Sequence, residues 1–318
     1  MLFQQRSIII KFTNIFGSFF NQMFNMKKFI GFVAKSFLLI LILLVFLDLF
    51  YTAIYLQASD RGKIDFVYNS KARIYDVVVL GSSRANNHFV TQLFEDKGLK
   101  AFNFGMSGGH LFEASLILKL MIERNYSIKN VIIETDLNIA NDHRADGISS
   151  KFLPYIHNSK IIEEHFREEK DFSKLYYIPF YRYIAFDAQI GFREMFFNVI
   201  HKKTAHLQNL GYSPLKVGSK GNMKNDIRAL KPIQNKYYEE IKKICAENHI
   251  NLIAVMTPMC STTKGLDYFE KVKKIYPEIH NYENAVEGDQ YFSSCGHMND
   301  AGARLFTTRI LNDFFIKK

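Results

Sequence analysis

The sequence predicts an α/β protein, a three-layer α/β/α domain around a mostly parallel five-stranded sheet, with a helical insertion and one N-terminal transmembrane helix. Three observations lead to this prediction. Strand-like runs alternate with helical patterns after residue 74, an aromatic and basic stretch interrupts the alternation at about 140–230, and a long apolar run lies near the N-terminus. Alternating strands and helices form right-handed βαβ units, whose parallel sheet is covered by helices on both faces.

The composition suits a large folded core. Of the 318 residues, 48% are hydrophobic and 23% are charged, which excludes a disordered chain, a collagen and a small disulfide scaffold. The net charge is +10, and half of it lies in residues 1–35, which hold five Lys or Arg residues and no acidic residue. The remaining charge is thinly spread, so no nucleic-acid partner is expected. A basic N-terminus beside an apolar run indicates a membrane instead.

Residues 36–57 form the predicted transmembrane anchor. The run 36–56 has a single charge, at Asp48, and a helix of this length crosses roughly 30 Å of hydrocarbon. A cleaved signal peptide is the alternative, but its apolar region usually has only about 7–15 residues. Because the positive charge precedes the run, we expect a single-pass protein with a cytoplasmic N-terminus and an exported C-terminal domain. The lipid bilayer is therefore an expected partner.

The predicted organisation has four parts. A basic cytoplasmic N-terminus covers residues 1–35, the anchor covers 36–57, a polar linker covers 58–73, and the α/β domain with its insertion covers 74–318. Met26 is followed by two lysines and resembles a natural start. Residues 1–25 are accordingly either an upstream extension or an interfacial helix.

The elements of the domain follow in order along the chain. The β-branched run at 74–80 predicts a strand buried on both faces, as in parallel sheets. Further strands are expected at about 100–104, 131–134, 252–256 and 279–282. Helices are expected at about 86–97, 110–125, 232–248, 266–275 and 299–316, and within the insertion near 160–170 and 181–203.

Three loops that follow predicted strands carry residues that are able to take part in a reaction. In open parallel sheets, sites form outside the carboxyl ends of the strands. Ser83 follows the first strand at the start of a helix, where backbone N–H groups stabilise an oxyanion. A serine there is also an ordinary helix cap, and Arg84 beside it is expected on the surface. The second loop is the glycine-rich 103–109, and the third carries His297 just before the last helix.

Taken in order, VVLGSS at 78–83, NFGMSGG at 103–109 and HMNDAGA at 297–303 resemble the motifs of the GDSL/SGNH hydrolases. The resemblance covers roughly residues 74–318 apart from the insertion. It implies a flavodoxin-like fold and a Ser-His-Asp triad that cleaves or transfers acyl esters.

The resemblance also implies roles for individual residues. The family's nucleophile falls on Ser83 and its base on His297. The oxyanion donors fall on the backbone of Ser83, on Gly108 and on Asn138, with Asp136 as a rival to Asn138 because the family's Gly-x-Asn-Asp pattern is absent.

One position departs from the family pattern. The triad Asp normally lies three residues before the His, and Ser294 occupies that position here. The Asp fixes the tautomer of the imidazole and stabilises the imidazolium. Ser294 can accept a hydrogen bond but brings no charge. Asp289 and Asp300 are candidate replacements, and a backbone carbonyl could also orient the ring in a Ser-His dyad.

These observations support two functional hypotheses. The first is a membrane-anchored serine esterase or O-acyltransferase that acts on acyl esters of cell-envelope glycans through an acyl-enzyme. The architecture resembles proteins that O-acylate cell-surface polysaccharides, which implies a glycan or an acylated small molecule as substrate and a multi-span membrane acyltransferase as partner. The insertion at about 140–230 fits an anionic glycan, or alternatively a lid with its own core. The second hypothesis, motivated by Ser294, is a catalytically inactive binding or scaffold protein with the same fold.

Neither a cofactor nor a metal is expected. His110, Asp142, His143 and Asp146 have no recognised ligand spacing, and no Gly-x-Gly-x-x-Gly opens a helix after a strand. Among the three cysteines, Cys260 and Cys295 lie in loops expected at the same edge of the sheet. They either pair and pin the loop of His297 or remain independent thiols.

Overall fold

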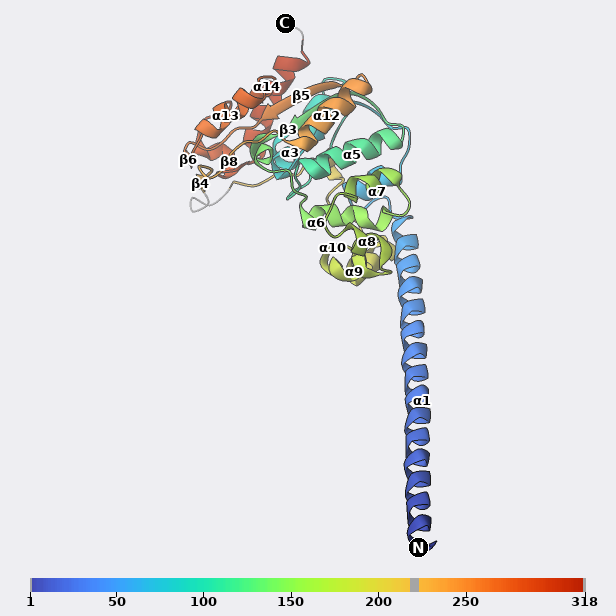
Figure 1. Cartoon of the computed structure of the whole chain (residues 1–318). Helices are drawn as coiled ribbons and strands as arrows, with labels where there is room; N and C mark the ends of the chain where they lie inside the picture. The colour runs from blue at the N-terminus through green and yellow to red at the C-terminus, as the bar shows by residue number, and fades with distance from the viewer. Residues whose placement is uncertain (1, 218–222, 317–318) are drawn as a thin grey trace. The chain divides into compact units, whose positions relative to one another are not determined.

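The computed structural model describes residues 2–217 and 223–316, with side chains from Met26 onward. It divides into two compact units, Met1–Phe50 and Tyr51–Lys318. Helix α1 (Leu2–Tyr55) makes up the first unit and its last turn belongs to the second (Figure 1). Within it, Met26–Tyr55 is long and apolar enough to cross a membrane, with a mean hydropathy of 2.8. The expected N-terminal apolar helix is therefore present.

The second unit is built on a five-stranded sheet with the order β2-β1-β3-β5-β7. All of its pairings are parallel, and Val78 of β1 aligns with Phe102 of β2 and with Val131 of β3. The strands are β1 (Ile74–Leu80), β2 (Ala101–Asn103), β3 (Ser127–Glu134), β5 (Asn251–Met256) and β7 (His280–Asn281). Along the chain this order is 2-1-3-4-5, which reverses between β1 and β3, where sites of doubly wound sheets form. The predicted α/β fold with a parallel five-stranded sheet is confirmed.

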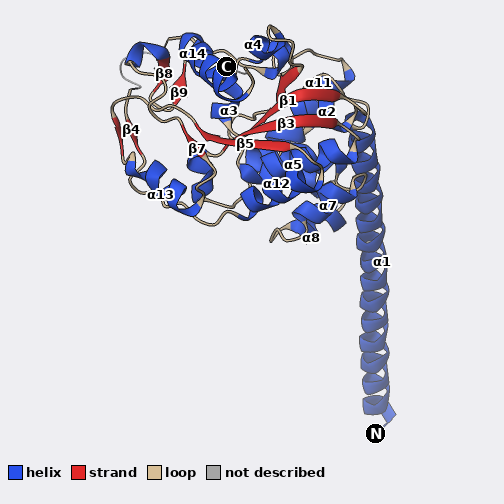
Figure 2. Ribbon diagram, turned by 90° about the horizontal axis from the view of Figure 1, so that it is seen from above, coloured by secondary structure: helices blue, strands red, loops and turns tan. Residues whose placement is uncertain are grey.

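Helices cover both faces of the sheet (Figure 2). On one face lie α5 (Leu111–Glu123) and α12 (Lys236–Glu247), and on the other lie α3 (Ser83–His88), α4 (Thr91–Glu95) and α14 (Asp300–Phe314). Helix α13 (Asp267–Ile275) follows β5. The centre of the sheet is dry, because the side chains of residues 77–80 and 131–133 are fully buried. Burying a side chain of this size contributes roughly 1.5–3 kcal/mol.

A chain of short helices fills the stretch between β3 and α12, where the sequence predicted an insertion. The helices are η1 (Asp136–Ala140), α6 (Asp146–Ser149), η2 (Ser150–Tyr155), α7 (Lys160–Phe166), α8 (Phe172–Tyr177), α9 (Tyr181–Ala185), α10 (Asp187–Ile190), α11 (Phe192–Val199) and η3 (Gln208–Gly211). The helix expected at 181–203 is three helices, since Gly191 is extended between α10 and α11.

Two small strand pairs lie outside the main sheet. β4 (Asn225–Asp226) pairs in parallel with β6 (Thr263–Lys264), and β8 (Phe292–Ser294) pairs antiparallel with β9 (His297–Met298). The turn η5 (Asp289–Tyr291) precedes β8. The β8–β9 hairpin presents His297 at the carboxyl edge of the sheet.

The single helix expected at 86–97 is broken at Phe89 and Val90 into α3 and α4. Side chains from distant elements satisfy the freed backbone groups. The amide of Asn103 donates to the carbonyls of Ala85 and Phe89, at 2.7 and 3.1 Å. The hydroxyl of Thr307 accepts the N–H of Val90 at 2.9 Å. Partners so far away along the chain cannot be read from a local pattern.

The predicted linker at 58–73 contains a helix, α2 (Lys63–Tyr68). Lys63 is only 7% exposed, and its ammonium donates to the carbonyls of Gly105 and Gly211 and to the side chain of Asn86, at 2.6–2.8 Å. Burial lowers the pKa of Lys63 to about 7. The segment after α1 is thereby fastened to the loop that precedes α5.

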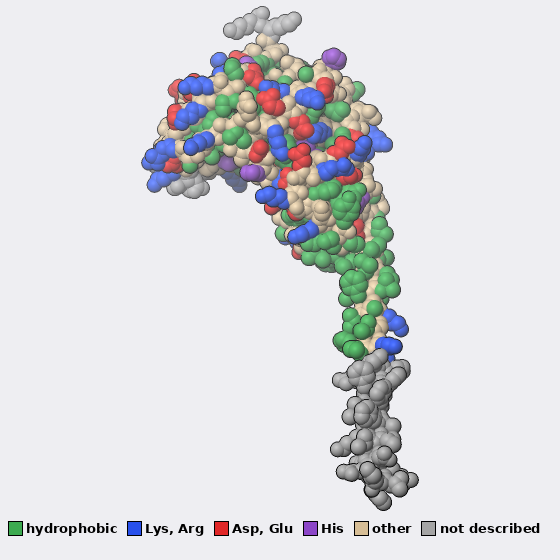
Figure 3. Space-filling view, viewed as in Figure 1, with side chains coloured by type: hydrophobic (Ala, Val, Ile, Leu, Met, Phe, Trp, Pro, Cys, Tyr) green, Lys and Arg blue, Asp and Glu red, His purple; other side chains and the backbone are tan. Residues whose placement is uncertain are grey.

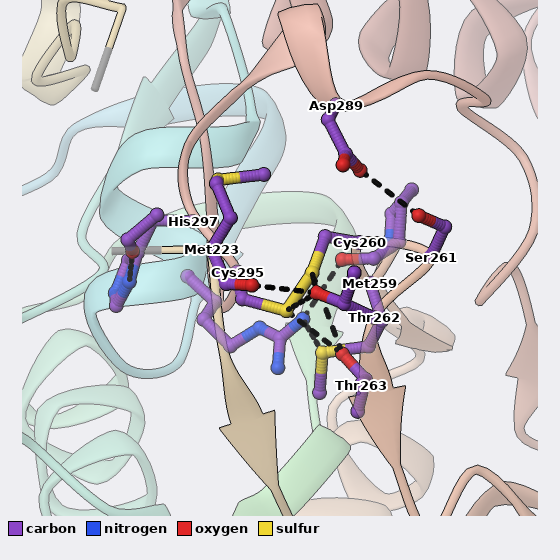
Figure 4. The surroundings of a disulfide bond; sticks show 12 residues. Met223, Met259, Cys260, Ser261, Thr262, Thr263, Asp289, Cys295 and His297 are labelled. Carbon is purple, nitrogen blue, oxygen red and sulfur yellow. Dashed lines mark hydrogen bonds between the residues drawn. A yellow bond between two sulfur atoms is a disulfide. The ribbon is translucent and has the colours of Figure 1, made fainter. Parts of the chain in front are cut away.

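Cys260 and Cys295 form a disulfide (Figure 4), which confirms the pairing alternative of the sequence analysis. Their Cα atoms are 4.9 Å apart, and the bond closes a loop of 35 residues. Cys245 is free and buried. The disulfide ties the β8–β9 hairpin to the segment after β5, two residues away from His297.

Removing this disulfide should destabilise the domain. The loop-closure entropy for a separation of 35 residues corresponds to about 4 kcal/mol, so the double variant Cys260→Ser/Cys295→Ser should unfold at a lower denaturant concentration. Thiol titration of the denatured, non-reduced protein should give one thiol, from Cys245, and none in a Cys245→Ala control. Three thiols before reduction would contradict the pairing.

Candidate functional site

Ser83 is the first residue of α3, directly beyond β1. The turn between them depends on Gly81, whose φ of +133° suits glycine, and a Cβ there would lie 2.9 Å from the side chain of Glu134. Ser82 caps the helix, since its hydroxyl accepts the N–H of Arg84 at 3.2 Å. The N–H groups of a first helical turn have no partner within the helix. The nucleophile position predicted from sequence therefore lies at the first turn of a helix, where its own N–H has no partner within the helix.

His297 lies beside Ser83, although it belongs to the C-terminal part of the domain's sequence. Its Nε2 lies 2.8 Å from the Ser83 hydroxyl, although the two residues are 214 positions apart. If Ser83 donates to Nε2, the neutral imidazole carries its proton on Nδ1. Nδ1 lies 3.4 Å from the hydroxyl of Ser294, a long contact. The pair has the geometry of a hydroxyl and its general base.

The two carboxylates considered as replacements for the triad Asp are bonded elsewhere. Asp300 accepts from the hydroxyl of Tyr212 at 2.9 Å and from Arg304 at 2.8 Å. Asp289 accepts from the hydroxyl of Ser261 at 3.1 Å. Within the described part of the chain, neither forms a hydrogen bond with His297. Ser294 is the side chain that the structure brings to Nδ1.

The electrostatic surroundings of His297 disfavour its charged form. Burial, followed by the nearby positive charge of Arg84, lowers the pKa of His297 to about 4. A triad Asp would act in the opposite direction, because it stabilises the imidazolium. The ring is therefore neutral, and available as an acceptor, throughout the physiological pH range.

A buried ion pair lies beneath Ser83. The Nε of Arg84 is 2.8 Å from a carboxylate oxygen of Asp136, and the two side chains are 5% and 0% exposed. The carboxylate also accepts the backbone N–H and the hydroxyl of Thr257, at 2.6 and 2.7 Å. Arg84 was expected on the surface, and that expectation is wrong. Its charge is held inside by a carboxylate from the end of β3 and by the segment after β5.

A second histidine, His88, connects the residues of the ion pair to the hairpin that carries His297. Thr257 Oγ1 lies 3.0 Å from Nδ1 of His88, whose Nε2 accepts the N–H of Met298 at 3.0 Å. An acceptor at Nε2 requires His88 to be neutral, with its proton on Nδ1. Burial, with Arg84 and His297 adding to it, holds the pKa of His88 well below its usual value. This side chain fixes the backbone next to His297.

Glu134 fixes the turn that carries Ser83. One of its oxygens accepts both the N–H and the hydroxyl of Ser82, at 2.9 and 2.6 Å. The side chain is fully buried. Burial, and then the repulsion of the neighbouring Asp136, raises the pKa of Glu134. Glu134 lies at the end of β3, and β3 is the neighbour of β1 in the sheet. Its carboxylate therefore reaches the turn after β1 and holds it in place.

A cavity of about 440 Å³ opens over these residues. Its lining includes five of the residues predicted from sequence, Ser83, Gly108, Asn138, Ser294 and His297. Gly108 has a φ of +82°, and the amide of Asn138 donates to Glu134 at 3.5 Å. Asp136 is not part of the cavity lining, and both of its carboxylate oxygens already accept hydrogen bonds from Thr257, one of them beside Arg84. The geometry favours Asn138 over Asp136 as an oxyanion donor.

Four residues that shape the site were missed or misjudged in the sequence, namely Arg84, His88, Glu134 and Thr257. Glu134 had a signal in the sequence, which it shares with Asp136, the residue already considered as a rival oxyanion donor. Glu134 and Asp136 stand two residues apart where an otherwise apolar strand ends, and acidic groups at such a position need a partner. His88 and Thr257 gave no signal, because their roles arise only when distant loops meet.

The low pKa of His297 has a measurable consequence. Reaction of Ser83 with a serine-reactive phosphonate requires the neutral imidazole, so its rate should stay constant from pH 8 to about 5 and fall as the pH drops through about 4. Ser294→Asp would place a carboxylate near Nδ1, raise the pKa of His297 and move this fall to higher pH. The same variant should react at least about tenfold faster at pH 8.

Ser294→Asn is the matched control, because it has the size of Asp without the charge and should leave the midpoint near that of the wild type. Circular dichroism at each pH separates loss of reaction from unfolding. A midpoint near pH 6.5 in the wild type, or no difference between the Asp and Asn variants, would contradict this description of the site.

Comparisons with known proteins add little to this geometry. No protein-family model matches the chain, and no curated protein matches it. A solved structure described as "a putative platelet activating factor from Streptococcus pneumonia" is similar with a TM-score of 0.28 and 10% sequence identity, over 90% of this chain and 99% of that chain. A similarity of this size does not show that the two proteins share a function.

Proposed function

We propose that this chain is a membrane-anchored serine esterase or O-acyltransferase of the SGNH type, acting on acyl esters of cell-envelope glycans. The observation that carries the proposal is the 2.8 Å contact between the Ser83 hydroxyl and Nε2 of His297, at the carboxyl edge of a parallel sheet. The order of the motifs around Ser83, Gly108 and His297, which resembles that of SGNH hydrolases, supports it.

The first half of the reaction forms an acyl-enzyme. Ser83 Oγ attacks the acyl carbonyl carbon while its proton passes to Nε2 of His297. The carbonyl oxygen becomes an oxyanion, which accepts hydrogen bonds from the N–H of Ser83, the N–H of Gly108 and the amide of Asn138. The C–O bond to the leaving alcohol then breaks, and the imidazolium returns its proton to that alcohol.

The second half returns the enzyme to its starting state. Water, in an esterase, or a sugar hydroxyl, in a transferase, gives its proton to His297 and attacks the acyl carbon. The bond to Ser83 Oγ breaks, and Oγ takes back the proton. Because the pKa of His297 is lowered to about 4, the ring accepts each proton less readily than a triad histidine, and chemistry at a moderate rate is expected.

Features around the site and before the domain support the proposed substrate class and location. Lys224 and Asn225 line the cavity beside the catalytic pair, and a cation there suits an anionic glycan. The apolar helix Met26–Tyr55 supports a membrane anchor. The positive charge that precedes this helix favours a cytoplasmic N-terminus. The domain at residues 74–318 would then lie on the other side of the membrane. A multi-span membrane acyltransferase would then supply the acyl group from the other side of the bilayer.

A binding or scaffold role is the second candidate, and one observation favours it. Among the residues that the structure describes, no carboxylate contacts Nδ1 of His297, and burial together with the cation Arg84 disfavours the imidazolium that acyl transfer requires. A cavity with backbone donors at a helix N-terminus binds an anionic ligand without chemistry.

Covalent labelling decides between the two candidates. The detergent-solubilised full chain should react with a fluorophosphonate, and peptide mass spectrometry should locate the adduct on Ser83. Ser83→Ala should abolish the labelling, and His297→Ala should slow it by about 100-fold or more, since a general base contributes that much. Folding of each variant is checked by its unfolding midpoint.

The same variants test the reaction in cells. A strain that carries Ser83→Ala should lose the surface-polymer acylation that the wild-type protein supports. Full acylation by this variant, together with an absence of labelling in the folded wild type, would overturn the enzymatic proposal and favour the binding protein.

A further inference from the structure

Exposed apolar side chains of the second unit are concentrated in one short segment. Eleven large hydrophobic residues after Phe50 are exposed in the described part of the chain, and seven of them lie within residues 177–200. These seven side chains, at 46–70% exposure, form what is here called the apolar surface of α8–α11. The other four are scattered over distant elements, where single exposed hydrophobic residues are normal.

The helices that carry the apolar surface pack in series, α8 against α9, α9 against α10 and α10 against α11. Helices α8, α9 and α10 lie together at one end of the second unit (Figure 1), and hydrophobic side chains gather on that end in the space-filling view (Figure 3). Phe192 and Phe196 of α11 stack with their ring centroids 6.3 Å apart. Contiguous apolar patches on a protein surface usually mark an interaction site.

The apolar surface lies where the apolar helix joins the second unit. Thr52 bonds to the hydroxyl of Tyr183 at 2.8 Å and accepts from Arg182 at 2.9 Å. The rings of Tyr51 and Phe180 meet edge to face with centroids 4.9 Å apart. These contacts fasten α9 to the last turn of α1, and the residues immediately before Tyr51 are the apolar run. Because α9 contacts the residues that directly follow the apolar run, α9 must lie close to the medium that surrounds the end of that run.

The charges around the apolar surface suit the headgroups of lipids. Residues 172–203 contain five Lys or Arg residues and two acidic residues. Arg182 is buried and donates to Thr52, so the remaining charges of the segment give a net charge of +2. Lys202 lies over the ring of Phe197, 3.9 Å from its centroid. Short helices with aromatic and aliphatic side chains on one side and lysines at the border are typical of segments that lie in the plane of a membrane interface.

We propose that the apolar surface of α8–α11 rests in the interface of the lipid bilayer, beside the point where α1 leaves it. This proposal rests on the membrane anchor of the proposed function. The surface would bury Tyr177, Ile184, Phe192 and Phe196 among acyl chains and place Lys202 at the anionic headgroups. The domain would then be held to the membrane at two places, which fixes its orientation as well as its distance.

A fluorescent probe at the surface tests the proposal in the full chain. A Cys245→Ala background leaves the disulfide intact, and Phe192→Cys is labelled with the environment-sensitive dye NBD. The protein is reconstituted into vesicles of phosphatidylcholine and phosphatidylglycerol. The probe should emit at shorter wavelength than in water and lose intensity when doxyl-labelled lipid is added, as expected for a side chain about 5–10 Å into the boundary between headgroups and acyl chains.

Leu305→Cys is the matched control, because Leu305 is a 49% exposed apolar residue of α14, outside the apolar surface. Its probe should show neither the shift nor the quenching. Flotation of the same vesicles reports on the anchor separately. If the protein floats but the probe at residue 192 behaves like the control, the anchor stands and this proposal fails. A wavelength shift without quenching would mean that protein, not lipid, covers the surface, which also overturns it. Failure to float would overturn both.

Discussion

The buried ion pair between Arg84 and Asp136 is the interaction on which the rest of the site depends. Two charges that are removed from water are costly unless both are paired and hydrogen-bonded. Here the carboxylate is bonded to the backbone and side chain of Thr257 as well as to Arg84. The pair joins α3 to the ends of β3 and β5. Removing either charge would leave the other buried and unpaired, at a cost of about 3–5 kcal/mol.

The same network explains how the site positions a histidine that lacks a triad carboxylate. In a Ser-His-Asp triad the Asp orients the ring through Nδ1. Here His88 holds the N–H of Met298, and the disulfide at Cys295 holds the other side of the hairpin. The backbone of His297 is thus fixed from both sides. The arrangement favours the geometry of the ring over its basicity, because burial, together with Arg84 of the same network, lowers the pKa of His297.

Local sequence patterns were enough to predict the sheet, and the resemblance of three motifs pointed to Ser83 and His297, which the structure brings within 2.8 Å of each other. The β-branched run at 74–80 and the glycine-containing turns after the strands made the strand ends recognisable, and Ser83, Gly108, Asn138 and His297 line one cavity as expected. What could not be predicted depends on contacts between distant segments. Arg84 is buried because Asp136 comes to it from the end of β3. The predicted linker is packed against the domain because the ammonium of Lys63 donates hydrogen bonds to three acceptors, at residues 86, 105 and 211.

The measurement that tests the central claim most directly is the structure of the phosphonylated protein. The account predicts a covalent bond between Ser83 Oγ and phosphorus, with the phosphoryl oxygen within hydrogen-bond distance of the N–H of Gly108 and the amide of Asn138. His297 Nε2 should face the leaving-group side, and the Arg84–Asp136 pair should be unchanged. A phosphoryl oxygen turned away from both donors, or an adduct on another residue of the folded protein, would contradict the claim that this cavity is built for acyl transfer.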